Sequence, residues 1–90
     1  MIRLRVKEVA QEKGFSLGRL SRASDVAYNT VKAIYRNPYK EVTFHTINRL
    51  ADTLAVPATA LLEDVTTEHA QEEIEAINSK RQRENLSEER

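Results

Sequence analysis

Apolar residues recur at intervals of three and four along the first 62 positions, the spacing of helices that bury one face. The inward positions of the first three predicted helices are Ile2, Val6 and Val9, then Leu17 and Leu20, then Val31 and Ile34. The pattern predicts a first helix over residues 2–13, a second that runs to the turn at Asp25, and a third over residues 28–36.

Residues at the ends of these helices support the same division. Gly14 can adopt the left-handed conformation that closes the first helix, and Ser16 is a good N-cap for the second. Asp25 stands where the chain must reverse, and Asp tolerates unusual backbone angles better than most residues. Asn37 precedes Pro38, which favours an extended backbone and ends the third helix near Arg36.

A fourth helix is expected from a cap at Thr43 to about Ala55, because its apolar positions have helical spacing throughout. These positions are Ile47, Leu50, Ala51 and Leu54. Pro57 suits the first turn of a short fifth helix, whose Leu61 and Leu62 close the core. The sequence therefore predicts an all-α fold of five helices in residues 1–65.

Beyond Val65 the composition changes, and residues 66–90 form a charged C-terminal tail. Ala70, Ile74 and Ile77 keep a helical spacing among Glu, Gln, Lys and Arg. The tail is either a helix that docks along this narrow seam or a partly disordered, solvated segment. The chain is thus divided into a domain of residues 1–65 and a tail of residues 66–90.

The net charge of zero conceals an uneven distribution along the chain. Residues 1–65 carry ten Lys or Arg and seven acids, whereas residues 66–90 carry four Lys or Arg and seven acids. Between residues 16 and 40 five cations face one acid. This segment has the positive field that a phosphate-binding surface requires.

The composition argues against several other classes of protein. There is no cysteine, which excludes disulfides and thiolate metal sites. The N-terminus lacks the apolar core of a secretory signal, and no run reaches the roughly 20 apolar residues of a membrane span. His45 and His69 lie far apart, without a thiol or a glycine-rich loop. We therefore expect a cytoplasmic protein that is not an enzyme and uses no cofactor or metal.

Residues 16–37 have the outline of a helix-turn-helix, with Val26 filling the turn. The outward residues of its second helix are Tyr28, Asn29, Thr30, Lys32, Ala33 and Arg36. Asn can pair with adenine and Lys with guanine in the major groove, while the methyl groups of Thr and Ala can pack on thymine. Tyr28 and Arg36, with Tyr39 and Lys40 in the following loop, are expected at phosphates or flanking bases.

Residues 3–63 resemble the Cro and phage-repressor type of helix-turn-helix domain, also called the XRE family. The matching residues are Gly14, Phe15, Ser16, Leu20, Val26, Thr30, Val31 and Ile34, then residues 46–51 and 54–57. The resemblance implies a lambda-repressor-like fold that binds DNA. Leu17, Asp25 and Ala27 depart from the family's Gln, Gly and Ser. The first departure leaves Ser16 and Arg19 as the expected phosphate contacts at the start of the second helix.

We interpret the chain as a sequence-specific regulator of transcription that binds double-stranded DNA. We expect it to act as a repressor. One such unit reads few base pairs, so a homodimer on two half-sites about 34 Å apart is expected. Its interface is predicted at Ile74 and Ile77 of the tail or on the fourth and fifth helices. Two alternatives remain: an antitoxin whose acidic tail binds a basic toxin, and a protein-interaction module without DNA binding.

Overall fold

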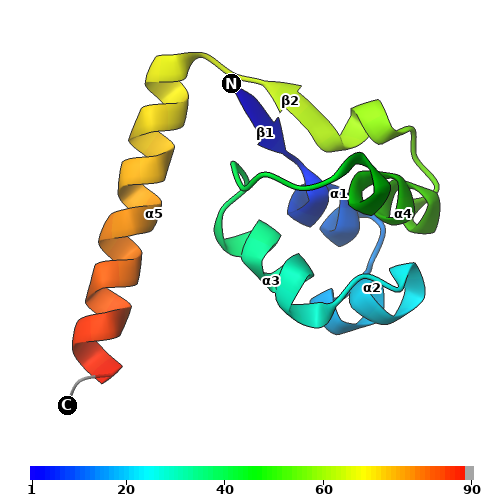
Figure 1. Ribbon diagram of the computed structural model, residues 1–90, viewed down its shortest axis with the longest axis horizontal. Helices are drawn as coiled ribbons and strands as arrows, with labels where there is room; N and C mark the ends of the chain where they lie inside the picture. The colour runs from blue at the N-terminus through cyan, green and yellow to red at the C-terminus, as the bar shows by residue number, and fades with distance from the viewer. Residues whose placement is uncertain (89–90) are drawn as a thin grey trace.

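The computed structural model describes the backbone of residues 1–88 and the side chains as far as Gln82. Its α-helices are α1 (Val6–Glu12), α2 (Leu17–Ser24), α3 (Tyr28–Arg36), α4 (Phe44–Leu54) and α5 (Thr67–Glu88). A 3₁₀ turn, η1 (Ala58–Leu61), precedes a short strand, β2 (Leu62–Asp64), which pairs antiparallel with β1 (Ile2–Leu4). As Figure 1 shows, α1 to α4 form the body, and α5 runs along one side of it. The predicted all-α class is confirmed.

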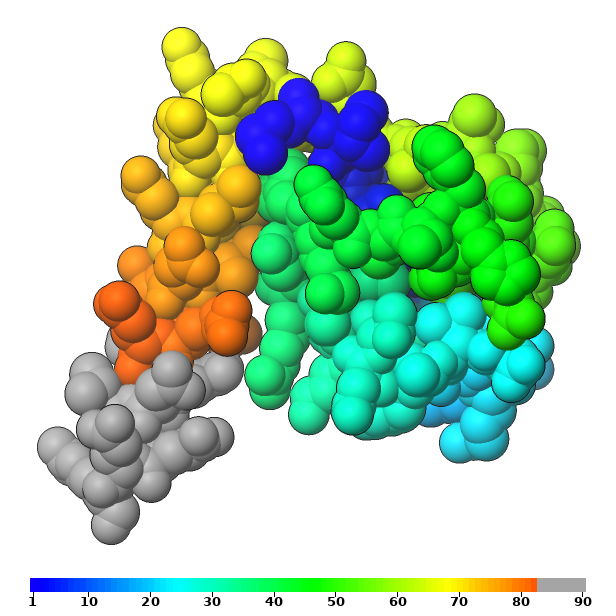
Figure 2. All heavy atoms as spheres, in the orientation of Figure 1, coloured from blue at the N-terminus to red at the C-terminus, as the bar shows by residue number. Residues whose placement is uncertain are grey.

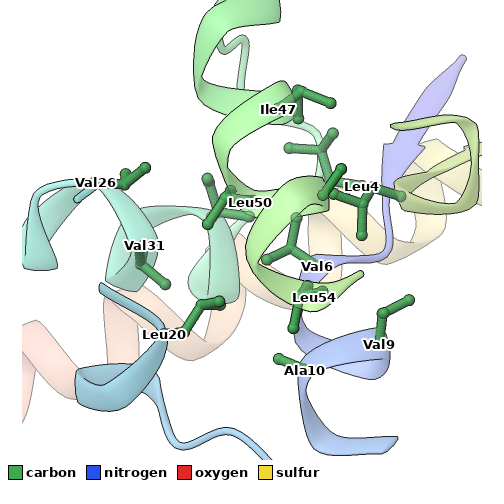
Figure 3. Packing of buried hydrophobic residues seen from close by; sticks show 13 residues of the cluster. Leu4, Val6, Val9, Ala10, Leu20, Val26, Val31, Ile47, Leu50 and Leu54 are labelled. Atoms are coloured by element: carbon green, nitrogen blue, oxygen red, sulfur yellow. The ribbon is translucent and has the colours of Figure 1, made fainter. Parts of the chain in front are cut away.

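The core lies where α1, α2, α3 and α4 meet. Figure 3 shows Leu20, Val31, Leu50 and Leu54 converging from three of these helices. All four side chains are almost completely buried, as are the other predicted inward positions of α4. Val26 is also buried, in the turn between α2 and α3. The helical spacing of apolar residues therefore identified the faces that form the core.

The predicted helix ends are also confirmed by local geometry. The hydroxyl groups of Ser16 and Thr43 accept hydrogen bonds from backbone N–H groups three residues later, as N-caps do. Gly14 has a φ of +76°, and Asp25 adopts the left-handed conformation with a φ of 58°. Asn37 is extended, and α3 ends at Arg36. These ends fix the angle at which α3 leaves the turn.

The predicted first helix is wrong over its first residues, because residues 2–4 form β1 and the helix begins only at Val6. Ile2 was expected to face inward, yet it is 55% exposed. Apolar and cationic residues alternate here, which is the two-residue period of a strand. The partner strand, β2, lies about sixty residues away in the sequence.

The segment after Pro57 was predicted to form a fifth α-helix, and this prediction is also wrong. The segment forms the four-residue 3₁₀ turn η1. Leu61 is buried as predicted, but Leu62 has already left the turn and pairs with Leu4 in the sheet. Pairing with β1 satisfies backbone groups that a longer helix would have bonded internally. The fifth α-helix is instead α5, in the segment predicted as a tail.

α5 is a single helix from Thr67 to Glu88, in the segment for which the sequence left a docked helix and a partly disordered tail as alternatives. The hydroxyl of Thr66 accepts a hydrogen bond from the backbone N–H of His69 at its start. Ala70 is completely buried, and Ile74 and Ile77 are half-buried. The predicted seam thus faces the body. Residues 89 and 90 of the predicted tail lie outside the described part of the chain.

Candidate nucleic-acid interface

α3 presents two faces of opposite character. Val31 and Ile34 are buried in the core and fix the rotation of the helix. Asn29, Lys32 and Arg36 lie on the other side and are exposed. The burial of Val31 and Ile34 sets the rotation of α3 about its axis. This rotation alone points the polar residues away from the body. The helix can therefore offer hydrogen-bond donors and cations to a ligand at its outer face.

The outer face of α3 borders a hollow of about 390 Å³ between α3 and α5. We call it the α3–α5 cleft. Its lining residues are Asn29, Lys32, Ala33, Arg36, Asn37, Lys40, Ile77 and Arg81. Five of these eight are residues that the sequence predicted to bind DNA. Figure 2 shows the later turns of α5, in orange, standing apart from the cyan-green surface of α3.

The α3–α5 cleft is lined by cations without acidic residues. Four of its eight lining residues are Lys or Arg. A second hollow, of about 380 Å³, shares Lys32, Arg36, Ile77 and Arg81 with the first and adds Lys7 and Lys80. No Asp or Glu lines either hollow. Three of the five cations of residues 16–40, namely Lys32, Arg36 and Lys40, therefore line these hollows.

The other predicted DNA-binding residues lie outside this cleft. Tyr28, at the start of α3, is 52% exposed. Thr30 lines a separate hollow, together with Lys40, residues 41–43 and Thr46. Ser16 is the N-cap of α2, and the guanidinium of Arg19 lies 4.7 Å from the centre of the Phe15 ring. The sequence therefore predicted residues on more than one side of α3.

Tyr39 was predicted at the DNA backbone, but its hydroxyl donates a 2.5 Å hydrogen bond to Glu73 of α5. The same carboxylate accepts hydrogen bonds from Nε and Nη2 of Arg3, each 3.0 Å long. Arg3 also contacts Glu8 of α1. This group of side chains connects α5 to β1 and to the loop after α3, and it determines where α5 lies beside the body.

The electrostatics of this connection follow from its geometry. The hydrogen bond from Arg3 lowers the pKa of Glu73, and the hydroxyl of Tyr39 acts in the same direction against the effect of burial. Burial and the carboxylate together raise the pKa of Tyr39 to about 12. Glu73 is therefore ionised and Tyr39 neutral at physiological pH, and the connection between α5 and the body is intact.

Seven residues that line the two hollows were not among the predicted DNA-binding residues: Lys7, Leu17, Tyr35, Asn37, Ile77, Lys80 and Arg81. The side-chain oxygen of Asn37 accepts a hydrogen bond from the backbone of Tyr39, which leaves its amide nitrogen as a donor. For Arg81 a signal was present in the sequence. It lies four residues after Ile77 and continues the helical spacing of Ala70, Ile74 and Ile77.

The described residues meet the requirements of neither a metal site nor a membrane-spanning helix. No group of three or more His, Cys, Asp or Glu side chains gathers there as metal ligands would. No described helix combines the length and apolar character needed to cross a membrane.

Comparisons with known proteins agree with this geometry. The family model for the Cro/C1-type helix-turn-helix DNA-binding domain matches residues 5–67. A chain of the solved SinR protein/SinI protein complex is 26% identical, with a TM-score of 0.62 over 94% of this chain and 90% of that one. No curated protein matched the sequence. The family match spans more than half of the chain and includes every helix of the body, so this protein belongs to the Cro/C1-type helix-turn-helix family of DNA-binding transcriptional regulators.

Proposed function

We propose that the protein is a cytoplasmic transcriptional repressor that binds double-stranded DNA as a homodimer and reads its sequence with α3. Asn29 and Lys32 are the base-reading residues, with Thr30 and Ala33 packing on thymine methyl groups. Arg36 and Lys40 bind phosphates that flank the groove, and Tyr28, Ser16 and Arg19 add contacts at its other edge. A bound dimer represses transcription by occupying the promoter.

One observation carries this proposal: four of the six outward residues predicted on α3 lie together on an acid-free surface of the helix. Asn29, Lys32, Ala33 and Arg36 all line the α3–α5 cleft. An α-helix with its side chains is about 10 to 12 Å across, and the major groove of duplex DNA is about 12 Å wide. A single helix with polar and cationic residues on its outer face therefore fits the groove, as in other helix-turn-helix proteins.

The electrostatic part of the proposal is tested by the salt dependence of binding. A binding site is first selected from random duplex DNA, and its association constant is then measured at several salt concentrations. Each phosphate that a Lys or Arg neutralises contributes about −0.9 to the slope of log K against log salt. We expect a steep negative slope. Absent binding, or binding with a flat salt dependence, would favour the interaction module without DNA binding.

A homodimer requires an interface, and the exposed apolar surface around the start of α4 is suited to form it. Phe44 is 86% exposed and Ile2 is 55% exposed, on the border of a largely apolar hollow of about 530 Å³. Exposed apolar patches of this kind mark interfaces. Lys40 and Glu41 lie at its edge, so a two-fold axis can bring opposite charges together. By contrast, Ile74 and Ile77 of the tail are partly covered by the chain's own body.

Replacing Phe44 by Ala is therefore expected to weaken dimerisation, because it removes the largest exposed apolar side chain of this surface. Ile77→Ala is the matched variant for the alternative interface on α5, and we expect it to leave the dimer constant unchanged. Light scattering at several protein concentrations gives both constants. If Ile77→Ala dissociates the dimer and Phe44→Ala does not, the interface belongs on the tail.

A second candidate function is the binding of a partner protein by α5. The similarity to a chain of the SinR protein/SinI protein complex supports it, because that structure contains two different proteins. Exposed Glu68, Glu72 and Glu75 give the first half of α5 an acidic surface suited to a basic partner. An antitoxin would combine this partner binding with DNA binding. Co-purification with a basic protein encoded beside it would support this alternative.

A further inference from the structure

The second half of α5 places its cations beside those of α3. Lys80 and Arg81 are the cations among the described side chains of α5, and both line hollows that α3 also lines. Across the cleft stand Lys32 and Arg36. The acids of α5 whose side chains are described all belong to residues 68–75, outside these hollows. The described part of α5 that lines these two hollows therefore contributes cations and no acid to a surface that is already positive.

Compensation of these cations in the described part of the chain is indirect, because Glu8 and Glu73 line a neighbouring hollow that Arg36 also lines. The ion pairs there involve Arg3, Arg49, His69 and the N-terminal ammonium group. None of them includes a cation of the cleft. Like charges that face each other across a narrow space repel, and the repulsion is relieved when an anion lies between them. The two walls thus form a site for a chain of negative charges.

The position of the α5 wall is set by the first half of the helix. Buried Ala70 and the hydrogen bonds of Glu73 to Arg3 and Tyr39 hold that half against the body. Because an α-helix rises about 1.5 Å per residue, Arg81 lies about 12 Å beyond Glu73 along the helix axis. Arg81 therefore lies on a continuation of the same helix, across the cleft from α3.

We infer that α5 forms the second wall of the DNA site, with Arg81 and Lys80 binding the phosphates of one DNA strand opposite Lys32, Arg36 and Lys40. The inference rests on the proposed function, since α3 must lie in the major groove for a strand to enter the cleft. A hollow of about 390 Å³ has room for a short stretch of one sugar-phosphate strand. The strand at one edge of the groove fits this description.

The test compares the DNA affinity of single-charge variants of the full chain. Arg81→Ala and Lys80→Ala are each expected to weaken binding about five- to tenfold in 0.1 M salt, equally for all sequences, and to make the salt slope shallower by about 0.9. Lys13→Ala removes the same charge at the exposed end of α1, outside the cleft, and is expected to change both quantities little. Glu73→Ala, which removes the hydrogen bonds of α5 to Arg3 and Tyr39, is expected to weaken binding as the Arg81 variant does.

Each other outcome has a definite meaning. If Arg81→Ala and Lys80→Ala match Lys13→Ala while the parent binds selected DNA with a steep salt slope, α5 is no part of the site and the proposed function stands without it. If Arg81→Ala or Glu73→Ala raises the affinity, α5 obstructs the site and the inference is wrong. If the parent binds no duplex, the proposed function fails, and the inference fails with it.

Discussion

Leu50→Ala is expected to lower the free energy of unfolding by about 2 to 5 kcal/mol, the range for a buried leucine truncated to alanine. Leu50 is completely buried at the centre of α4, where side chains from α2 and α3 meet it. The surrounding helices can move into the resulting cavity only in part, because each is held in place by its other packing contacts. For a domain of this size the loss is a large share of the total stability.

Thermal or urea denaturation followed by circular dichroism measures this effect. Lys80→Ala is the control, because Lys80 is exposed and its removal leaves no cavity. We expect the control to unfold like the parent. If Leu50→Ala proves as stable as the parent, Leu50 is not in the core, and the helical register that also fixes the outer face of α3 is wrong.

The second large effect is expected at the base-reading residues. Asn29→Ala and Lys32→Ala should each weaken binding to the selected site by about 1 to 3 kcal/mol, the range for a bidentate contact to a base edge. Each replacement should also relax the preference at one base pair, because alanine cannot distinguish the bases that Asn and Lys do. Both side chains are exposed, so their loss leaves the fold intact.

Arg19→Ala serves as the comparison for this pair, since Arg19 is proposed to bind phosphate and is also exposed. It should weaken all sequences alike. Binding to a library of site variants measures the two kinds of loss together. If Asn29→Ala and Lys32→Ala reduce affinity uniformly across the library, α3 does not read bases in the proposed orientation.

The parts of the fold that the sequence predicted are those decided by neighbouring residues. The spacing of Leu50 and its neighbours determined the buried face of α4, and a single hydroxyl at Ser16 determined the start of α2. The outer face of α3 followed from the inward positions of Val31 and Ile34, since the helical period places Asn29, Lys32 and Arg36 on the other side. Local rules therefore sufficed for the helix-turn-helix and for the outer face of α3 that the proposed function uses.

The parts that sequence reasoning missed depend on residues far apart in the chain. β1 has three residues and becomes a strand because β2 pairs with it from positions 62–64. The place of α5 depends on Glu73, whose partners Arg3 and Tyr39 lie 70 and 34 residues away. Contacts between residues so far apart in the chain produce no periodic pattern in the sequence. The apolar seam of α5 was visible in the sequence, but the surface that it covers was not, so Arg81 was not expected to line the α3–α5 cleft.

Chemical footprinting of the complex tests most directly the claim that α3 lies in the major groove. Dimethyl sulfate methylates guanine at N7, in the major groove, and adenine at N3, in the minor groove. On a selected site we expect the protein to protect guanine N7 in two half-sites about 34 Å apart and to leave adenine N3 reactive. The Lys32→Ala variant should lose protection at one guanine in each half-site. Protection of adenine N3 with guanine N7 unaffected would contradict the account.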